Sequence, residues 1–171
     1  MNTEELKNLQ VPIKEKYRKE PEDAFIILKA QGKIGEGISC KVETGKAIVE
    51  AGLHPATGGD GMLSCSGDML LEALVACAGV TLKAVSTAIG VCIDDGIIKA
   101  EGDLDFRGTL GVSKEAEVGF KAIRLSFNLE CDATAEQLDT LAKLTKRYCV
   151  VYQTLTKGVQ METVFNTLLM E

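Results

Sequence analysis

Two cysteines that lie far apart in the sequence are the residues best suited to chemistry. Cys77 lies inside the apolar segment from Ser66 to Leu82, and Cys149 follows Tyr148 far downstream. A thiolate attacks the O–O bond of a peroxide and becomes sulfenic acid, and a second thiol condenses with that acid to give a disulfide. The pair therefore fits redox chemistry. Free cysteines are also commonly buried as small hydrophobes, so packing remains open for each of them taken alone.

The composition excludes several classes of partner. The chain has 171 residues, which fits one domain with a substantial core, and its formal net charge is −6. Lysines and arginines are dispersed among acidic residues, so we expect neither nucleic acid nor an anionic membrane as a partner. The acidic, polar start of the chain is unlike a secretory signal, which favours a cytoplasmic location and reduced thiols.

No metal or other cofactor is expected from the pattern of ligand residues. The chain has 6 cysteines and 1 histidine, and no two cysteines have the C-x-x-C spacing of zinc and iron–sulfur sites. His54, in a loop rich in proline and glycine, is a weak candidate for a site and is better interpreted as a plain loop residue. Glycines 58–61 are not followed by the G-K-[ST] of a phosphate-binding loop.

The elements that must position the two cysteines begin after an N-terminal arm. Residues 1–22 mix charges closely and predict a solvated amphipathic arm, helical between Pro12 and Pro21, followed by one domain over residues 23–171. A strand is expected from Ala24 to Ala30. Alternating residues over 38–42 and 46–50, separated by Thr44-Gly45, predict two or three antiparallel strands in this region.

A long helix carrying Cys77 is the central element of the prediction. Ser66 is the expected N-cap, Asp68 adds a carboxylate in the first turn, and Gly90 is the expected C-cap. Because the helix is apolar nearly all round, other structure must surround it. Glu72 and Lys83 interrupt its apolar run, so burial in a protein core is preferred to a membrane span.

The second half predicts a strand pair, a helix and a final strand. Alternating residues over 97–108 and 120–131 predict antiparallel strands. Thr134 and Gln137 form a capping box at the start of a helix with the stripe Leu138, Leu141 and Leu144. The β-branched residues after Cys149 predict a bend or a new helix start there. Residues 159–169 are expected to form the last strand.

This order of elements resembles the OsmC/Ohr family of thiol-dependent hydroperoxide reductases over about residues 24–170. The family carries a Ser-(Pro)-x-Glu-Leu-Leu-Leu-Ala-Ala-Leu-Ala-x-Cys helix and a later Cys-Pro-Val-Ser-like segment. Residues 66–77, Ser-Gly-Asp-Met-Leu-Leu-Glu-Ala-Leu-Val-Ala-Cys, match the first element closely. Residues 149–155, Cys-Val-Val-Tyr-Gln-Thr-Leu, match the second loosely, with Val150 in place of proline.

The resemblance implies an α+β fold in which curved antiparallel sheets surround a long buried central helix, and two chains form an intertwined homodimer. It implies that Cys77 is the peroxidatic residue and Cys149 the resolving one. The implied substrate is an organic hydroperoxide, the implied reductant is a dithiol, and no cofactor is required.

The resemblance also raises the question of what activates the thiol. In the family an arginine from the N-terminal strand region does so, and this chain has no arginine between Arg18 and Arg107. Arg18 is therefore a supporting candidate if the arm folds over the site. Asp68 and Glu72 are further supporting candidates, although a cap and a surface ion pair are the simpler roles for them.

Two other functions remain open on the same fold. The chain could be a non-catalytic protein that binds a small hydrophobic ligand, or a thiol sensor whose disulfide alters dimer contacts. Adjacent thiols with an activating group favour the enzyme, whereas distant or sealed thiols favour ligand binding. The other cysteines, Cys40, Cys65, Cys92 and Cys131, are expected to pack or to be incidentally exposed.

Overall fold

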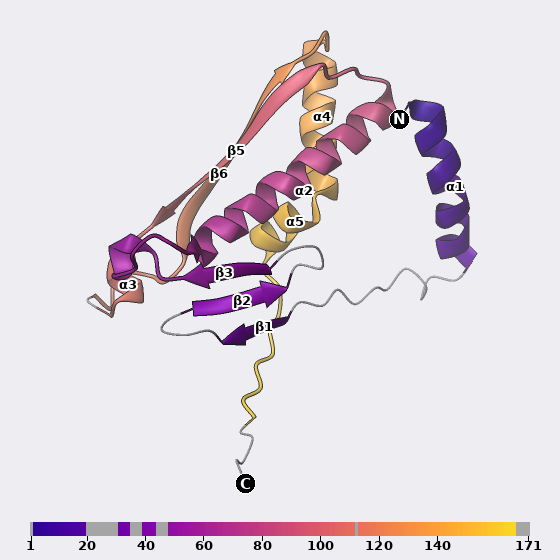
Figure 1. Cartoon of the computed structure of the whole chain (residues 1–171). Helices are drawn as coiled ribbons and strands as arrows, with labels where there is room; N and C mark the ends of the chain where they lie inside the picture. Colours follow the sequence, from indigo (N-terminus) through magenta and orange to yellow (C-terminus); the bar gives the residue numbers. More distant parts are fainter. Residues whose placement is uncertain (1, 20–30, 35–38, 44–47, 112, 167–171) are drawn as a thin grey trace.

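The computed structural model describes residues 2–19, 31–34, 39–43, 48–111 and 113–166. Its long helix lies between a two-stranded β ribbon and two shorter helices, with a small sheet near its N-terminal end (Figure 1). In chain order the elements are α1 (Thr3–Lys19), β1 (Gln31–Ile34), β2 (Ser39–Glu43), β3 (Ile48–Gly52), β4 (Ser64–Cys65), α2 (Ser66–Ile89), β5 (Asp95–Leu104), α3 (Phe106–Thr109), β6 (Phe120–Glu130), α4 (Ala135–Tyr148) and α5 (Val150–Lys157).

The small sheet confirms the antiparallel strands expected near the N-terminus. Its order is β1-β2-β3-β4, in which β1 pairs with β2 and β2 with β3 antiparallel. The short β4 pairs with β3 in parallel through Ala51–Ser64 and Gly52–Cys65, which leads the chain directly into α2. The strand expected at residues 24–30 lies outside the described residues.

The β5–β6 ribbon is also confirmed as an antiparallel pair, with Ile98 opposite Phe127 and Ala100 opposite Leu125. Its side chains alternate between half-buried and exposed, and α2 packs against β5. The first strand ends at Leu104 rather than at Gly108. Asp105 ends it because its side chain accepts a hydrogen bond from the backbone N–H of Arg107 and caps the short α3.

Helix α2 begins one residue earlier than predicted. Cys65, in an extended conformation, occupies the N-cap position and makes no side-chain capping bond, so the assignment of Ser66 as N-cap was wrong. Its pairing with β3 holds Cys65 in that extended conformation and leaves Ser66 as the first helical residue. Gly90 ends the helix in the left-handed region at φ 74°, as predicted.

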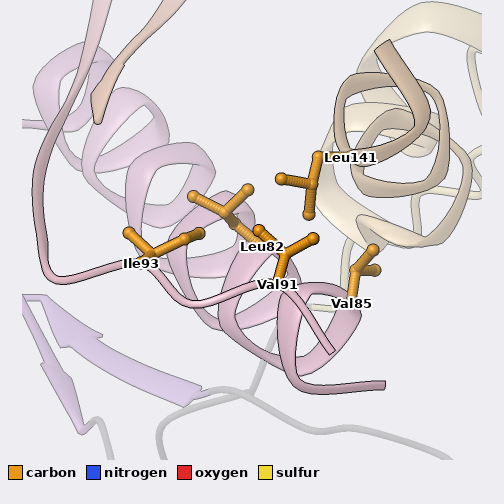
Figure 2. Close-up of a cluster of buried hydrophobic side chains, with 5 residues drawn as sticks. All are labelled: Leu82, Val85, Val91, Ile93 and Leu141. Atoms are coloured by element: carbon orange, nitrogen blue, oxygen red, sulfur yellow. The ribbon is translucent and has the colours of Figure 1, made fainter. Parts of the chain in front are cut away.

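Helix α2 carries most of the core but is not covered all round. Leu82 and Val85 of α2 meet Leu141 of α4 and the segment after Gly90, which contributes Val91 and Ile93 (Figure 2). Yet Val80 is 74% exposed. Within the described part of the chain α2 therefore contacts β5, α4, α5 and α1 but leaves a strip that includes Val80 open, whereas the sequence predicts cover all round.

By length and composition, Ser66–Ile89 could also cross a membrane, although the core helix of a soluble protein passes the same test. In its most hydropathic window 28% of the residues are buried inside the structure.

Helix α4 begins as the sequence predicts. The Thr134 side chain accepts from the N–H of Gln137, and the Gln137 side chain accepts from the N–H of Thr134, which completes the capping box. Of the expected leucine stripe only Leu141 is fully buried, since Leu138 is 40% exposed.

The two ends of the chain differ from the prediction. Helix α1 runs from Thr3 to Lys19 and includes Pro12, whereas the sequence predicts a helix only between Pro12 and Pro21. It starts early because Asn2 and Glu5 exchange side-chain-to-backbone hydrogen bonds of 2.9 Å that cap its first turn. The Thr3 hydroxyl donates to the carbonyl of Thr87 and ties α1 to α2.

The last strand expected from residue 159 is absent over residues 158–166. The structure gives this segment no strand partner among the described residues.

The contrast between Leu141 and Leu138 on one helix gives a stability test. Leu141→Ala removes a side chain that is 2% exposed, and we expect it to lower the free energy of unfolding by about 2–4 kcal/mol. Leu138→Ala is the matched control and should cost less than about 1 kcal/mol, because its side chain is already exposed to water. Urea unfolding followed by circular dichroism measures both. Equal losses would contradict the core described above.

Candidate functional site: a pair of coupled thiols

The structure brings Cys77 and Cys149 together. Cys149 is 1% exposed and forms a buried cluster with Leu74 and Ala78 of α2, and the half-buried Cys77 packs against that cluster. Both are free thiols, and each shifts the pKa of the other. Cys77 reaches the cluster because Leu74 and Ala78 are its neighbours on the same side of the helix.

Cys149 lies where one helix ends and the next begins, which confirms the predicted break. Its extended backbone, φ −72° and ψ 108°, makes it both the C-cap of α4 and the N-cap of α5. Its N–H donates to the carbonyl of Thr145, and its carbonyl accepts from the N–H of Gln153, both at 2.9 Å. The first N–H groups of α5 are therefore free to act on neighbouring atoms.

These N–H groups point to Cys77 and change its acidity. Burial alone raises the pKa of Cys77, but hydrogen bonds from the N–H of Val151, the thiol of Cys149 and the N–H of Val150 outweigh burial and lower it. The Thr81 hydroxyl donates to the carbonyl of Cys77 at 2.7 Å. The start of a helix stabilises a thiolate through such donors and through its dipole. Cys77 is thus the thiol predisposed to ionise.

The pKa of Cys149 shifts in the opposite direction. Burial raises it most, and proximity to Cys77 raises it further because a second thiolate beside the first is unfavourable. The N–H of Tyr152 opposes this shift without reversing it. The two groups titrate as a coupled pair in which one thiol ionises and the other keeps its proton.

Of the supporting candidates, Asp68 and Glu72 do not act on the thiols, and Arg18 stays a prediction. Asp68 and Glu72 are exposed on the first two turns of α2, and neither is among the principal influences on the pKa of Cys77. Arg18 lies on α1, and its side chain is outside the described part of the chain. The principal influences on Cys77 include no charged side chain.

The remaining candidates have ordinary structural roles. The Nδ1 of His54 accepts from the N–H of Ala56, and its ring stacks on Phe106 at 4.9 Å. Cys92 is exposed, and its hydrogen bond to Asp94 raises its pKa, which makes it a poor nucleophile. Among the described residues, no three His, Cys, Asp or Glu side chains are grouped so as to hold a metal ion.

Two cavities lie near the thiol pair and are lined by residues that neighbour the two cysteines. One, of about 590 Å³, includes Leu74 and Tyr152 from the cysteine cluster, with aliphatic and aromatic residues of β6 and with Lys121 and Lys146. The other, of about 520 Å³, lies between α1 and α2. It includes Thr81, one turn after Cys77, and Tyr148, which precedes Cys149. Each cavity is large enough for a small organic molecule, although neither Cys77 nor Cys149 lines it.

Sequence reasoning missed the backbone donors at the start of α5. It sought a cationic side chain, and it considered only the dipole of the helix that carries Cys77. The signal was present in the predicted helix start after Cys149, because a new helix start carries free N–H groups.

Comparisons with known proteins agree with this fold. A family model described as OsmC-like protein matches residues 59–164, more than half of the chain, so the chain belongs to the OsmC-like protein family. No curated protein sequence matches it.

Several solved structures share the fold. The OsmC-like protein of Mycoplasma pneumoniae is 15% identical with a TM-score of 0.65, covering 78% of this chain and 89% of that chain. The organic hydroperoxide resistance protein of Elizabethkingia anophelis is 15% identical with a TM-score of 0.62, covering 79% and 91%. OhrB of Bacillus subtilis is 19% identical with a TM-score of 0.53, covering 79% and 93%. The α+β fold of the family is thereby confirmed.

The opposite environments of the cysteines predict different alkylation profiles. The rate of alkylation follows the thiolate fraction, so Cys77 should reach half of its maximal rate at a pH below that of a free cysteine, and Cys92 at a pH above it. Iodoacetamide labelling across pH, with the modified peptides quantified by mass spectrometry, measures both in one sample. A Cys77 profile at or above that of Cys92 would contradict the geometry of the site.

Replacing Val150 tests the backbone donor directly. Val150→Pro deletes one N–H at the first helical position, where proline is tolerated, and the extended backbone of Cys149 suits a following proline. We expect the pKa of Cys77 to rise by about half a unit. Val150→Ala is the control, because it keeps the N–H and loses only a side chain that is 68% exposed. If both variants leave the alkylation profile of Cys77 unchanged, this N–H does not act on the sulfur.

Proposed function

We propose that this protein is a thiol-dependent peroxidase that reduces organic hydroperoxides, with Cys77 as the attacking residue and Cys149 as the resolving one. The observation that carries the proposal is the contact between two thiols whose pKa values shift in opposite directions. A peroxidase of this kind needs one ionised thiol as the nucleophile and one neighbouring thiol that condenses with the sulfenic acid. A core that merely packs two cysteines needs no such difference.

The proposed reaction has three steps. The Cys77 thiolate attacks the outer oxygen of ROOH, the O–O bond breaks, and RO⁻ leaves and takes up a proton to become an alcohol, while Cys77 becomes a sulfenic acid. The Cys149 sulfur then attacks the Cys77 sulfur, and the S–OH oxygen leaves as water with the Cys149 proton. An external dithiol reduces the resulting disulfide by two successive thiol–disulfide exchanges, which restores both thiols.

The surroundings of the sulfurs favour organic substrates over hydrogen peroxide. Both cavities near the pair are lined largely by apolar side chains, which favour the binding of an organic group. The names of two structural neighbours, the organic hydroperoxide resistance proteins of Elizabethkingia anophelis and Bacillus subtilis, support the same class of substrate. A cytoplasmic location is part of the proposal, because the cytoplasm keeps thiols reduced.

Thiol counting tests this function. After one equivalent of cumene hydroperoxide, the native protein should lose two thiols and gain a Cys77–Cys149 disulfide detectable by peptide mass spectrometry. Cys77→Ser should lose none at a comparable rate, and Cys92→Ser should behave as the native protein does. If native protein keeps its thiols, or if Cys77→Ser consumes the oxidant equally fast, the peroxidase proposal fails and binding of an apolar ligand in the cavities becomes the better explanation.

The proposed working form is a homodimer in which a second copy covers the apolar surface that one chain leaves open. Val80 on α2 is exposed, as are apolar side chains along the extended C-terminal segment, where Val164 is 78% and Phe165 92% exposed. Such surfaces on a soluble protein are typical of association sites. A second copy also supplies strand partners for this segment and cover for the open side of α2.

Light scattering coupled to size exclusion tests the dimer. We expect twice the mass of the chain for the native protein at micromolar concentration. Phe165→Asp should weaken association at least tenfold, because it places a charge in the proposed interface. Gln160→Asp, a matched change at an exposed polar residue of the same segment, should leave the mass unchanged. A monomeric native protein would rule the dimer out.

A further inference from the structure

We propose that Gln153 is a positioning residue: its side-chain amide ties α5 to the last turn of α4 and so holds the first turn of α5 against the sulfur of Cys77. This role rests on the proposed function of the thiol pair. Gln153 would then help to keep Cys77 reactive without itself belonging to the cysteine cluster.

Gln153 makes two hydrogen bonds that span the junction between the helices. Its backbone N–H donates to the carbonyl of Cys149 at 2.9 Å, which closes the first turn of α5. Its side-chain Nε2 donates to the carbonyl of Lys146 at 2.7 Å, which belongs to the last turn of α4. The carbonyls of a last helical turn have no partner within their own helix, so this amide satisfies a carbonyl that the break at Cys149 leaves without one.

Packing alone holds α5 weakly. None of its residues is fully buried, and only Val151 and Tyr152 pack against the cysteine cluster. Val150, next to the junction, is mostly exposed. An eight-residue helix with so little buried surface is free to rock about an extended junction residue such as Cys149. The bond from Gln153 to Lys146 crosses that junction and limits the rocking.

The angle between the helices decides where the N–H groups of Val150 and Val151 point. Hydrogen bonds weaken steeply when the donor turns away from the acceptor, so a small rotation of α5 weakens both bonds to the sulfur. The part of its burial that Leu74 and Ala78 of α2 provide does not depend on such a rotation. Losing the tie should therefore shift Cys77 toward its protonated form without removing any atom near it.

Gln153→Met is the test, because it keeps the size and flexibility of the side chain and deletes the amide. Gln160→Met is the matched control at an exposed glutamine on the C-terminal segment. The first measurement is the pH profile of iodoacetamide labelling of Cys77, which requires no peroxidase activity. We expect the profile of Gln153→Met to move up by about half a pH unit and that of Gln160→Met to stay with the native protein.

The second measurement is the rate of Cys77 oxidation by cumene hydroperoxide across pH. Below the pKa of Cys77, Gln153→Met should react about threefold more slowly than native protein, and above it the two rates should converge. A rate lowered equally at every pH, an unmoved labelling profile, or a Gln153→Met protein that fails to fold beside a folded Gln160→Met would overturn the proposal. A moved profile in a protein that reduces no hydroperoxide would instead uphold the positioning role and reject the peroxidase.

Discussion

The contact between the sulfur of Cys77 and the first turn of α5 is the interaction on which the proposed chemistry depends. A thiol this close to an apolar core has a raised pKa unless donors compensate for lost water. Here the donors are backbone N–H groups of Val150 and Val151 together with the thiol of Cys149. Because the backbone supplies them, the acidity of Cys77 is a property of how α4 and α5 are joined.

The rest of the fold serves to bring that helix start to the middle of α2. The cluster of Leu82, Val85 and Leu141 fixes α4 against α2, and the buried Leu74 and Ala78 receive Cys149 at the end of α4. The β5–β6 ribbon closes the other side of α2. Small shifts in this packing move α5 relative to Cys77, so core stability and thiol reactivity are linked through one set of contacts.

The sequence predicted the elements whose signals are local. The capping box at Thr134, the glycine stop at Gly90 and the alternation in β5 and β6 each depend on residues close together in the chain, and the structure has them all. The prediction of a last strand from residue 159 was wrong over the described residues, because a strand needs a partner and the described part of one chain offers none. The prediction that α2 is covered all round was wrong for a similar reason, since apolar composition does not say whether the cover comes from the same chain.

The candidate site shows the same division. The family pattern identified Cys77 and Cys149, and the structure places them in contact. The backbone donors that lower the pKa of Cys77 were missed because a backbone N–H has no residue type of its own, whereas an arginine can be recognised in the sequence. The only sign of these donors in the sequence was the predicted break at Cys149. Their effect on Cys77 follows only from the packing of α5 on α2.

Backbone activation suits a site with apolar walls better than a cation would. A guanidinium beside Cys77 would lose its water of hydration, and the free-energy cost of that loss is offset only when the buried charge has a partner. The N–H groups of Val150 and Val151 carry no net charge and have no partner within their own helix. In the pattern that this chain resembles, proline occupies the position of Val150 and an arginine activates the thiol. Valine here supplies an N–H at the position next to Cys149, and this N–H lowers the pKa of Cys77.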